Sequence, residues 1–406
     1  MNATVNQITE ETREIGRSMI EKAKAMLETL RERASTTESL GKVDPRTIDD
    51  FHQAGFFKMF QSSLWGGYEC HPADIFKVQE IIGQACPSSS WIMGVVGVHN
   101  WQMAHFSKEA QEDVWKDDSN VLISSSYAPT GSVEEVEGGC ILKGRWFYSS
   151  GVDHCDWILV GANIVTEGSP FPDYRTYLVP RSEFKVIDDW QVLGLKGTGS
   201  KSVEIKEAFV PLHRQLPAIA SQMNNTPGMQ DGTADSPLFR IPFPGIFGAC
   251  ITTPALGAAQ GMLDIFTEAS KSATSLYSGA KWSAEQMTQM RIAESDAELR
   301  GARLQMEANY NEMIDVISRD EDLELVDRGR YRFDHCNLVD TADKAADRLF
   351  VASGARSLMI NQPLQRFYLD IQAARVHAIN NRVKWGSVFG QMSMDHYPDD
   401  ILALFI

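Results

Sequence analysis

Serine, histidine and aromatic residues gather in a few short segments of the chain, in types and spacings that suit the binding of a flat ring system. The segment 144–157 reads GRWFYSSGVDHCDW, and its predicted strand ends at Ser150, before Gly151. Glycine permits a sharp turn there, and a serine hydroxyl at a strand end can donate to or accept from a heterocycle. The alternative is a polar strand end at an ordinary turn.

A second segment, ISSSYAP from Ile123, places three serines in a predicted strand that is otherwise apolar. Buried hydroxyls need hydrogen-bond partners, so these serines either line a site or belong to an edge strand whose hydroxyls meet water. Successive side chains of a strand point to opposite faces, so Ser124 and Ser126 share one face and Ser125 lies on the other.

Two of the nine histidines stand in unusual surroundings. His99 lies in the apolar helical stretch GVVGVHNWQ beside Trp101, and His377 lies in AARVHAINN, on a predicted helix whose neighbouring side chains are small. Small neighbours leave room for a ligand, and histidine can exchange a proton near neutral pH. Satisfied packing inside a core is the alternative for each histidine.

The sequence lacks the motifs of several other chemistries. No Cys or His pair has zinc-site spacing, and the adjacent His154 and Cys155 are too close to ligate one ion well, so no metal site is predicted. The chain has no P-loop, GxSxG or HExxH motif. The stretch 194–200, GLKGTGS, lies between predicted strands and lacks GxGxxG spacing, which argues against a Rossmann nucleotide site.

The elements that must position these residues form three compositional blocks. Residues 1–118 have helical periodicity, with a capped helix start at Asp44-Pro45, and residues 119–215 carry short β-rich runs. The polar stretch 216–240 is typical of a linker, and helical patterning returns in 241–406, with long segments predicted at 247–275, 284–317, 337–356 and 363–388. This order predicts an α+β protein with an N-terminal helical domain, a central antiparallel β-barrel or sandwich, and a C-terminal four-helix bundle.

Charge and cysteine usage limit the partners and the compartment. The 406-residue chain has a formal net charge of −16, which excludes nucleic acid as a partner and disfavours an anionic membrane surface. Its six cysteines include no CxxC pair, as expected of unpaired thiols in a reducing compartment. No apolar run reaches the ~20 residues that span a bilayer, and the N-terminal segment carries acids and has no apolar core like that of a signal peptide. We therefore expect a cytoplasmic protein.

The segment WQVLGLKGTGS, from Trp190 to Ser200, and the following VEIKEAFVP at 203–211 resemble the acyl-CoA dehydrogenase superfamily. That superfamily has a tryptophan, a Gly-Leu/Met-Arg/Lys-Gly-Thr/Ser turn and a strand that runs to Val-Pro. Its plan of a helical domain, a central β-barrel domain and a C-terminal four-helix bundle is similar to the block order of nearly the whole chain. The resemblance therefore implies the same fold.

Two departures from the dehydrogenases point to one branch of the superfamily. Dehydrogenases abstract a substrate proton with a glutamate, commonly in an Arg-Asp…Tyr-Glu-Gly segment, whereas residues 366–378 here read RFYLDIQAARVHA. The stretch SSSYAPTGSVEE also replaces their Thr-Glu-Pro…Gly-Ser-Asp strand. Together with Ser-Gly-x-Asp-His at 150–154, His377, His99 and the serine strand, these changes resemble the oxygenase components of two-component flavin-dependent monooxygenases, such as that of 4-hydroxyphenylacetate 3-hydroxylase.

This resemblance implies an oxidoreductase that uses reduced FMN or FAD as a diffusible co-substrate together with O₂. In the branch, a separate NAD(P)H-dependent flavin reductase supplies the reduced flavin, which forms a C4a-hydroperoxide and transfers one oxygen atom. We expect hydroxylation of a small aromatic substrate, phenolic or indolic, by a homotetramer. The alternatives are N- or S-oxygenation within the branch and an FAD-containing acyl-CoA dehydrogenase, which the missing glutamate disfavours.

The branch also implies roles for individual residues. Ser150 would hydrogen-bond the flavin N5, and His377 would stand beside the flavin C4a. His99 and Ser125 would face the substrate, with His99 sharing the proton of a phenol. Trp101 would belong to an apolar wall that excludes water. The other predicted cofactor contacts are Trp146 and Tyr148, as walls of the flavin site, and Arg240, at the N1–C2 carbonyl in a positive patch located there or at a subunit interface.

Overall fold

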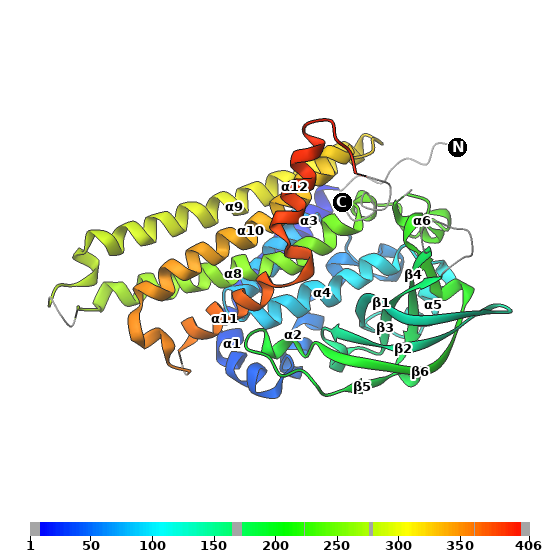
Figure 1. Cartoon of the computed structure of the whole chain (residues 1–406), viewed down its shortest axis with the longest axis horizontal. Helices are drawn as coiled ribbons and strands as arrows, with labels where there is room; N and C mark the ends of the chain where they lie inside the picture. Colours follow the sequence, from blue (N-terminus) through cyan, green and yellow to red (C-terminus); the bar gives the residue numbers. More distant parts are fainter. Residues whose placement is uncertain (1–8, 165–172, 223, 276–278, 361, 399–406) are drawn as a thin grey trace.

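The computed structural model describes residues 9–164, 173–222, 224–275, 279–360 and 362–398. Helices, then strands, then helices follow one another along the described chain, so the predicted α+β order is confirmed. The N-terminal helices are α1 (Glu10–Leu40), α2 (Pro45–Ala54), α3 (Pro72–Gly83), α4 (Pro87–Met103) and α5 (Lys108–Trp115). The sheet lies at one end of the molecule and the long C-terminal helices at the other, with α4 between them (Figure 1).

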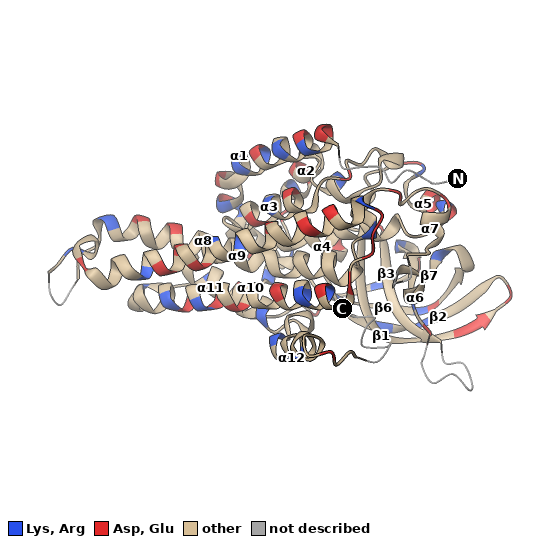
Figure 2. Cartoon of the chain, turned by 90° about the horizontal axis from the view of Figure 1, so that it is seen from above, with Lys and Arg blue, Asp and Glu red and all other residues tan. Residues whose placement is uncertain are grey.

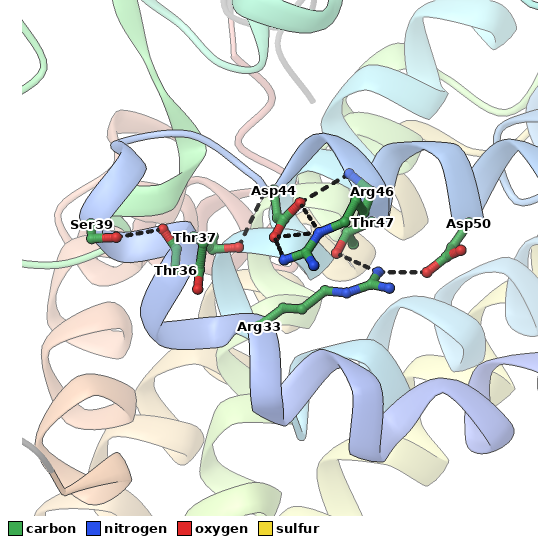
Figure 3. Close-up of polar contacts among 8 residues, drawn as sticks. All are labelled: Arg33, Thr36, Thr37, Ser39, Asp44, Arg46, Thr47 and Asp50. Atoms are coloured by element: carbon green, nitrogen blue, oxygen red, sulfur yellow. Dashed lines mark hydrogen bonds and ion pairs between the residues drawn. The ribbon is translucent and has the colours of Figure 1, made fainter.

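The connection between α1 and α2 carries a network of polar contacts (Figure 3). The Asp44 carboxylate accepts from the backbone N–H of Arg46 at 3.0 Å and caps α2, which confirms the predicted helix start. The backbone N–H of Asp44 donates to Thr37 Oγ1 at 3.2 Å, so the cap also ties α2 to the last turn of α1. Beside Thr37, Glu38 forms an ion pair with Lys196 of the glycine-rich turn at 3.6 Å.

Seven strands follow: β1 (Ile123–Val136), β2 (Gly139–Ser149), β3 (Trp157–Ile164), β4 (Asp173–Pro180), β5 (Lys185–Ile187), β6 (Lys201–Pro211) and β7 (Gln215–Pro217). They form one sheet in the order β5-β6-β2-β1-β3-β4-β7. Residues 123–126 of β1 pair with β3, and residues 132–136 pair with β2, so β1 changes partner along its length. This change folds the sheet over an apolar core that includes Val160 and Tyr177.

The prediction of a wholly antiparallel barrel is wrong at one strand pair. β1 and β3 run parallel, because the chain crosses over after β2 and enters β3 alongside the first half of β1. The other pairs in the described sheet are antiparallel. The edge strands β5 and β7 lie at opposite ends of the strand order, and no pairing between them is seen in the described part of the chain.

The C-terminal helices are α8 (Phe243–Ser272), α9 (Gln286–Ser318), α10 (Leu325–Ala352), α11 (Pro363–Arg375) and α12 (Arg382–Met392). α10 begins well before the predicted start at 337, because its first turns bury Tyr331 and His335 against the neighbouring helices. α8 is the core helix of this group. It is long and apolar enough to span a membrane by length and composition, and 94% of its apolar window is buried inside the protein.

The predicted helix 363–388 is wrong, because the chain breaks into α11 and α12 between residues 376 and 381. His377 caps a short 3₁₀ turn, and its side chain accepts from the backbone N–H of Ile379. The Asn381 side chain caps α12 in the same way, by accepting from the backbone N–H of Lys384. His377 therefore lies in a turn between two helices and not on a helix.

The predicted linker 216–240 contains the short helices α6 (Ala218–Gln222) and α7 (Pro227–Gln230), and part of it packs against the end of α4. The backbone N–H of Gly228 donates to the carbonyl of His105 at 3.0 Å, and Thr233 Oγ1 donates to the carbonyl of Ala104 at 3.0 Å. These bonds hold the segment beside the residues that follow α4.

Charged residues of both signs are interspersed along α1 and along the C-terminal helices, while acidic residues gather at the end of the β1–β2 hairpin (Figure 2). Glu134 and Glu135 belong to this acidic end of β1. The net charge of −16 is therefore spread over mixed surfaces.

Candidate active site

His99 lies on α4 in the interior of the molecule and has one free ring nitrogen. Its Nδ1 lies 2.5 Å from the carbonyl oxygen of Ile123 at the start of β1. A carbonyl only accepts, so Nδ1 carries the proton and Nε2 is left as a bare acceptor. Nε2 is buried and has no hydrogen-bond partner among the described residues. Burial lowers the pKa of His99 to about 4, although the bond to Ile123 opposes this shift, so the ring is neutral at physiological pH.

Aromatic rings surround the region beside His99. The ring of Tyr127 lies 6.2 Å from that of His99, and Phe243 and Phe247 of α8 lie 5.2 and 5.4 Å from Tyr127. Trp101 extends this aromatic group at 6.1 Å from Phe243. The rings give an apolar setting in which hydrogen bonds and charges are less screened than in water.

Two of these rings have satisfied polar atoms. The indole N–H of Trp101 donates to the carbonyl of Leu238 at 2.8 Å, which leaves the ring face as the part that can contact a ligand. The Tyr127 hydroxyl donates to Gln102 Oε1, and burial raises the pKa of Tyr127 well above its ordinary value. Tyr127 is therefore a neutral wall and not an acid at physiological pH.

Of the three serines at the start of β1, Ser125 shares a strand face with Tyr127. Its side chain lies near enough to the Tyr127 hydroxyl to oppose the rise in the pKa of Tyr127, whereas Ser124 Oγ donates to the carbonyl of Trp157 at 3.4 Å and Ser126 Oγ donates to that of Phe147 at 2.6 Å. The structure thus directs Ser125 towards the aromatic group and the other two serines towards neighbouring strands.

Ser150 lies where β2 ends, in the turn that the sequence predicted. Gly151 has a φ of +73°, in the left-handed region that favours glycine, and a Cβ there would come within 2.8 Å of Val96 on α4. This close approach places Ser150 Oγ 3.2 Å from the indole nitrogen of Trp91, also on α4. The strand end is thereby docked onto the same helix that carries His99.

His377 reaches the same side of α4 from the turn between α11 and α12. Its ring lies 5.8 Å from that of Trp91, so Trp91 contacts both Ser150 and His377. Its Nδ1 accepts from the backbone N–H of Ile379 at 3.2 Å, which leaves Nε2 to carry the proton. Burial and then the nearby charge of Arg332 lower the pKa of His377 to about 4.

Arg332, on α10, was not anticipated from the sequence. It is 3% exposed and forms no ion pair within the described residues; its guanidinium donates to the carbonyl of Ile379 at 2.7 Å and stacks 4.5 Å from the ring of Trp385. It therefore holds Ile379, the residue whose N–H donates to His377. Arg332 lies three residues before His335, so both side chains share one buried face of α10. This spacing was the available signal in the sequence.

The position of Trp146 contradicts the prediction that this residue forms a wall of the flavin site. The ring is fully buried in the core of the folded sheet, and its indole N–H donates to the carbonyl of Gly161 at 2.8 Å. Tyr148, predicted for the same role, is 73% exposed and has a φ of +65°. The two rings therefore lie in different surroundings, Trp146 in the core of the sheet and Tyr148 at the surface.

The prediction of a positive patch is wrong at Arg240 itself, while its alternative, a patch at a subunit interface, stays a prediction. The Arg240 guanidinium forms ion pairs with Asp320 at 2.7 Å and Asp322 at 3.6 Å, so two carboxylates balance its charge. A role for Arg240 at the flavin stays a prediction. The buried cation that the structure places near His377 is Arg332.

One buried carboxyl lies at the junction of α11 with the glycine-rich turn. Asp370 Oδ1 accepts from the backbone N–H of Leu195 at 2.5 Å. Burial raises the pKa of Asp370 to about 7, and the charged groups that face it are Glu38 of α1, Arg366 of α11 and Lys196 of the turn. The junction therefore titrates near neutral pH.

Comparisons with known proteins agree with this arrangement. Residues 249–382 match the family described as acyl-CoA dehydrogenase, C-terminal domain. The chain is 37% identical to the flavin-dependent monooxygenase oxygenase subunit HsaA of Rhodococcus jostii (strain RHA1), over 88% of this chain and 93% of that protein. It is 30% identical to the oxygenase component of p-hydroxyphenylacetate 3-hydroxylase of Acinetobacter baumannii, over 96% and 92%. The chain belongs to the family of flavin-dependent monooxygenase oxygenase subunits.

A solved structure agrees with this assignment of the oxygenase subunit. The crystal structure of the HsaA monooxygenase from M. tuberculosis has a TM-score of 0.90 to this chain at 33% identity, and the match covers 96% of this chain and 99% of that one. The fold of the oxygenase subunit is therefore that of an acyl-CoA dehydrogenase-like monooxygenase.

The residues near Ser150 and His377 in this oxygenase subunit fit a reduced flavin. A hydroxyl and an imidazole N–H both lie close to Trp91, where they can meet the polar edge of a ring system. Tyr148 and Val376, which neighbour Ser150 and His377 in the chain, are large apolar side chains exposed by 73% and 82%. Exposed apolar side chains of this kind are typical of a ligand or interface surface.

Proposed function

We propose that this oxygenase subunit hydroxylates a phenol on its ring, with reduced FMN or FAD and O₂ as co-substrates. The observation that carries the proposal is the free, neutral Nε2 of His99, which is buried beside an aromatic group and has no protein partner within the described chain. A phenol hydroxyl is the substrate group that can donate to such an atom while its ring packs against Tyr127 and Phe243.

His99 is proposed to accept the hydroxyl proton as the ring is oxygenated. Attack by the ring on an oxygen atom leaves positive charge on the ring and makes the hydroxyl strongly acidic. A neutral base at hydrogen-bond distance removes that proton and restores a neutral product. Ser125 of β1 and Trp101 of α4 are proposed to contact the substrate.

Ser150 and His377 are proposed to contact the flavin, Ser150 at N5 and His377 near C4a. When bound, reduced flavin would supply the electrons for O₂ reduction, and the oxygen atom that enters the ring comes from O₂. His377 holds its hydrogen at Nε2, because Ile379 occupies Nδ1, and can donate a hydrogen bond to the bound flavin. Trp91, which contacts both residues and is 5% exposed, excludes water from this edge.

The reduced flavin is proposed to come from a separate NAD(P)H-dependent reductase, since relatives of this chain are named as oxygenase components or subunits. A homotetramer is proposed from the family plan, with cofactor phosphate contacts supplied by a neighbouring subunit.

The test compares a phenol with its methyl ether in the presence of reduced FMN or reduced FAD and O₂. The ether has the same ring but has no proton to donate to His99 Nε2, so the phenol should give ring-hydroxylated product and the ether should give hydrogen peroxide alone. Product is measured by liquid chromatography and peroxide by a coupled peroxidase assay. Equal hydroxylation of both compounds would contradict the proposal, and turnover of only an indole or a thioether would move it to another oxygenation within the family.

A further inference from the structure

A continuous row of hydrogen bonds runs behind Ser150 into the glycine-rich turn. Ser150 Oγ lies 3.2 Å from Trp91 Nε1 on one side and 2.7 Å from Ser200 Oγ on the other. Ser200 Oγ lies 2.7 Å from Thr198 Oγ1, which lies 2.8 Å from the carbonyl oxygen of Leu195. The four side chains are buried, so water does not compete for these bonds.

Hydrogen counting fixes the direction of the whole row. A hydroxyl has one hydrogen, and a carbonyl only accepts, so Thr198 donates its hydrogen to Leu195. Ser200 must then donate to Thr198, and Ser150 must donate to Ser200. An indole N–H only donates, so Ser150 accepts from Trp91. The hydrogen of Ser150 is therefore committed, and its oxygen keeps one lone pair.

We infer that Thr198 and Ser200 are positioning residues that hold the Ser150 hydroxyl as a hydrogen-bond acceptor towards the reduced flavin. The inference rests on the proposed function, in which Ser150 contacts N5. Reduced flavin carries a hydrogen on N5, so the protein must offer an acceptor there. A serine free to rotate would present its own hydrogen in part of its rotamers and would repel the N5–H.

The turn that holds this row is itself anchored to α11. The Leu195 N–H donates to Asp370 Oδ1, and Leu195 has a φ of +52°, so its unusual backbone is held by this bond. A Cβ on Gly194 would lie 2.0 Å from the carbonyl oxygen of Leu369, so only glycine permits this approach. Because α11 leads directly into the turn of His377, one anchor serves both predicted flavin contacts.

The matched pair Thr198→Val and Thr198→Ser tests the inference. Valine has nearly the shape of threonine but no hydroxyl, so Ser200 loses its acceptor and its hydrogen turns to Ser150. The Ser150 hydrogen is then released towards the flavin. We expect T198V to weaken anaerobic binding of reduced FMN or reduced FAD about fivefold, the size of one lost neutral hydrogen bond, and to raise the ratio of peroxide to product. T198S keeps the hydroxyl and should restore both values.

Ser200→Ala provides a second variant with the same expected outcome, because Ser150 again loses the acceptor for its hydrogen. The backbone of the turn can be checked in the flavin-free protein. The N–H of Gly151 donates to the carbonyl of Thr198 at 2.9 Å, so unchanged hydrogen exchange at Gly151 shows that the turn is intact in each variant.

The outcomes separate this inference from the proposed function. If the wild-type protein neither binds reduced flavin nor hydroxylates a phenol, the proposed function fails before the variants are compared. If the wild type does both, and T198V and S200A match T198S in flavin affinity and peroxide ratio with the turn intact, the positioning role is overturned. A fall in affinity for T198V alone, without S200A, also contradicts it, because both substitutions free the same hydrogen.

Discussion

Replacement of His99 by asparagine removes the proposed base and keeps its anchor. The asparagine amide can donate to the carbonyl of Ile123, as Nδ1 of His99 does now at 2.5 Å, but no atom reaches the position of Nε2. His99→Asn therefore tests the free nitrogen more selectively than alanine, which would also leave the Ile123 carbonyl without its partner.

The size of the effect follows from two pKa values. A free phenol has a pKa of about 10, whereas burial lowers the pKa of His99 to about 4. Full proton transfer before reaction is thus uphill by about 8 kcal/mol, at 1.36 kcal/mol per unit. His99 therefore accepts a hydrogen bond in the bound complex and takes the proton only once the ring carries positive charge. Loss of such a base costs roughly 10²–10⁴ in rate.

We accordingly expect H99N to lower kcat about 100-fold or more while KM rises less than about tenfold, because one ground-state hydrogen bond is worth only about 1 kcal/mol. Oxygen consumption should continue, with peroxide replacing product. His105→Asn is the matched control, since His105 is equally buried and also has a free Nε2. Retention of wild-type product yield by H99N, or an equal loss in H105N, would refute the reasoning.

Three further substitutions test other parts of the structure. Asp370→Asn should gain stability relative to wild type as pH rises from 4 to 8, by about 4 kcal/mol at most, because burial raises the folded pKa of Asp370 from 3.8 to about 7 and the wild-type stabilisation by the protonated carboxyl is lost across that interval; chemical denaturation at each pH measures this. Trp146→Phe should cost about 2 kcal/mol of unfolding free energy by leaving the Gly161 carbonyl unpaired, with reduced-flavin affinity unchanged in titration. Arg332→Met should raise the pKa of His377 in an NMR titration, because burial and then the Arg332 charge lower it. An unchanged pKa of His377 would contradict an effect of the Arg332 charge.

The order of elements could be read from the sequence because it depends on local patterns. The Asp44 cap and the helical and β-rich blocks are encoded by neighbouring residues. The parallel pairing of β1 with β3 could not be read, because it depends on how the chain crosses over between distant strands. The break between α11 and α12 was missed for a similar reason: the signal is a histidine used as a cap, and histidine is not among the usual cap residues.

The candidate site was predictable where backbone alternation is regular. Ser125 could be separated from Ser124 and Ser126 because β1 is regular there. The surroundings of Trp146 and Tyr148 could not be predicted, because the positive φ of Tyr148 interrupts the regular strand just before the turn. Charge pairing is likewise a property of tertiary structure, so the sequence could not show that Asp320 and Asp322 neutralise Arg240.

The two histidines at the centre of the proposal show most clearly what tertiary contacts add. His99 is fully buried and His377 is half-buried, but burial lowers the pKa of each to about 4, so neither charge nor residue type distinguishes them. The difference comes from the backbone group at Nδ1, which is the carbonyl of Ile123 for His99 and the N–H of Ile379 for His377. One ring is therefore set to accept at Nε2 and the other to donate a hydrogen bond from Nε2. The proposed oxygenation uses an acceptor at the substrate and a hydrogen-bond donor at the flavin, and a single backbone contact assigns each role.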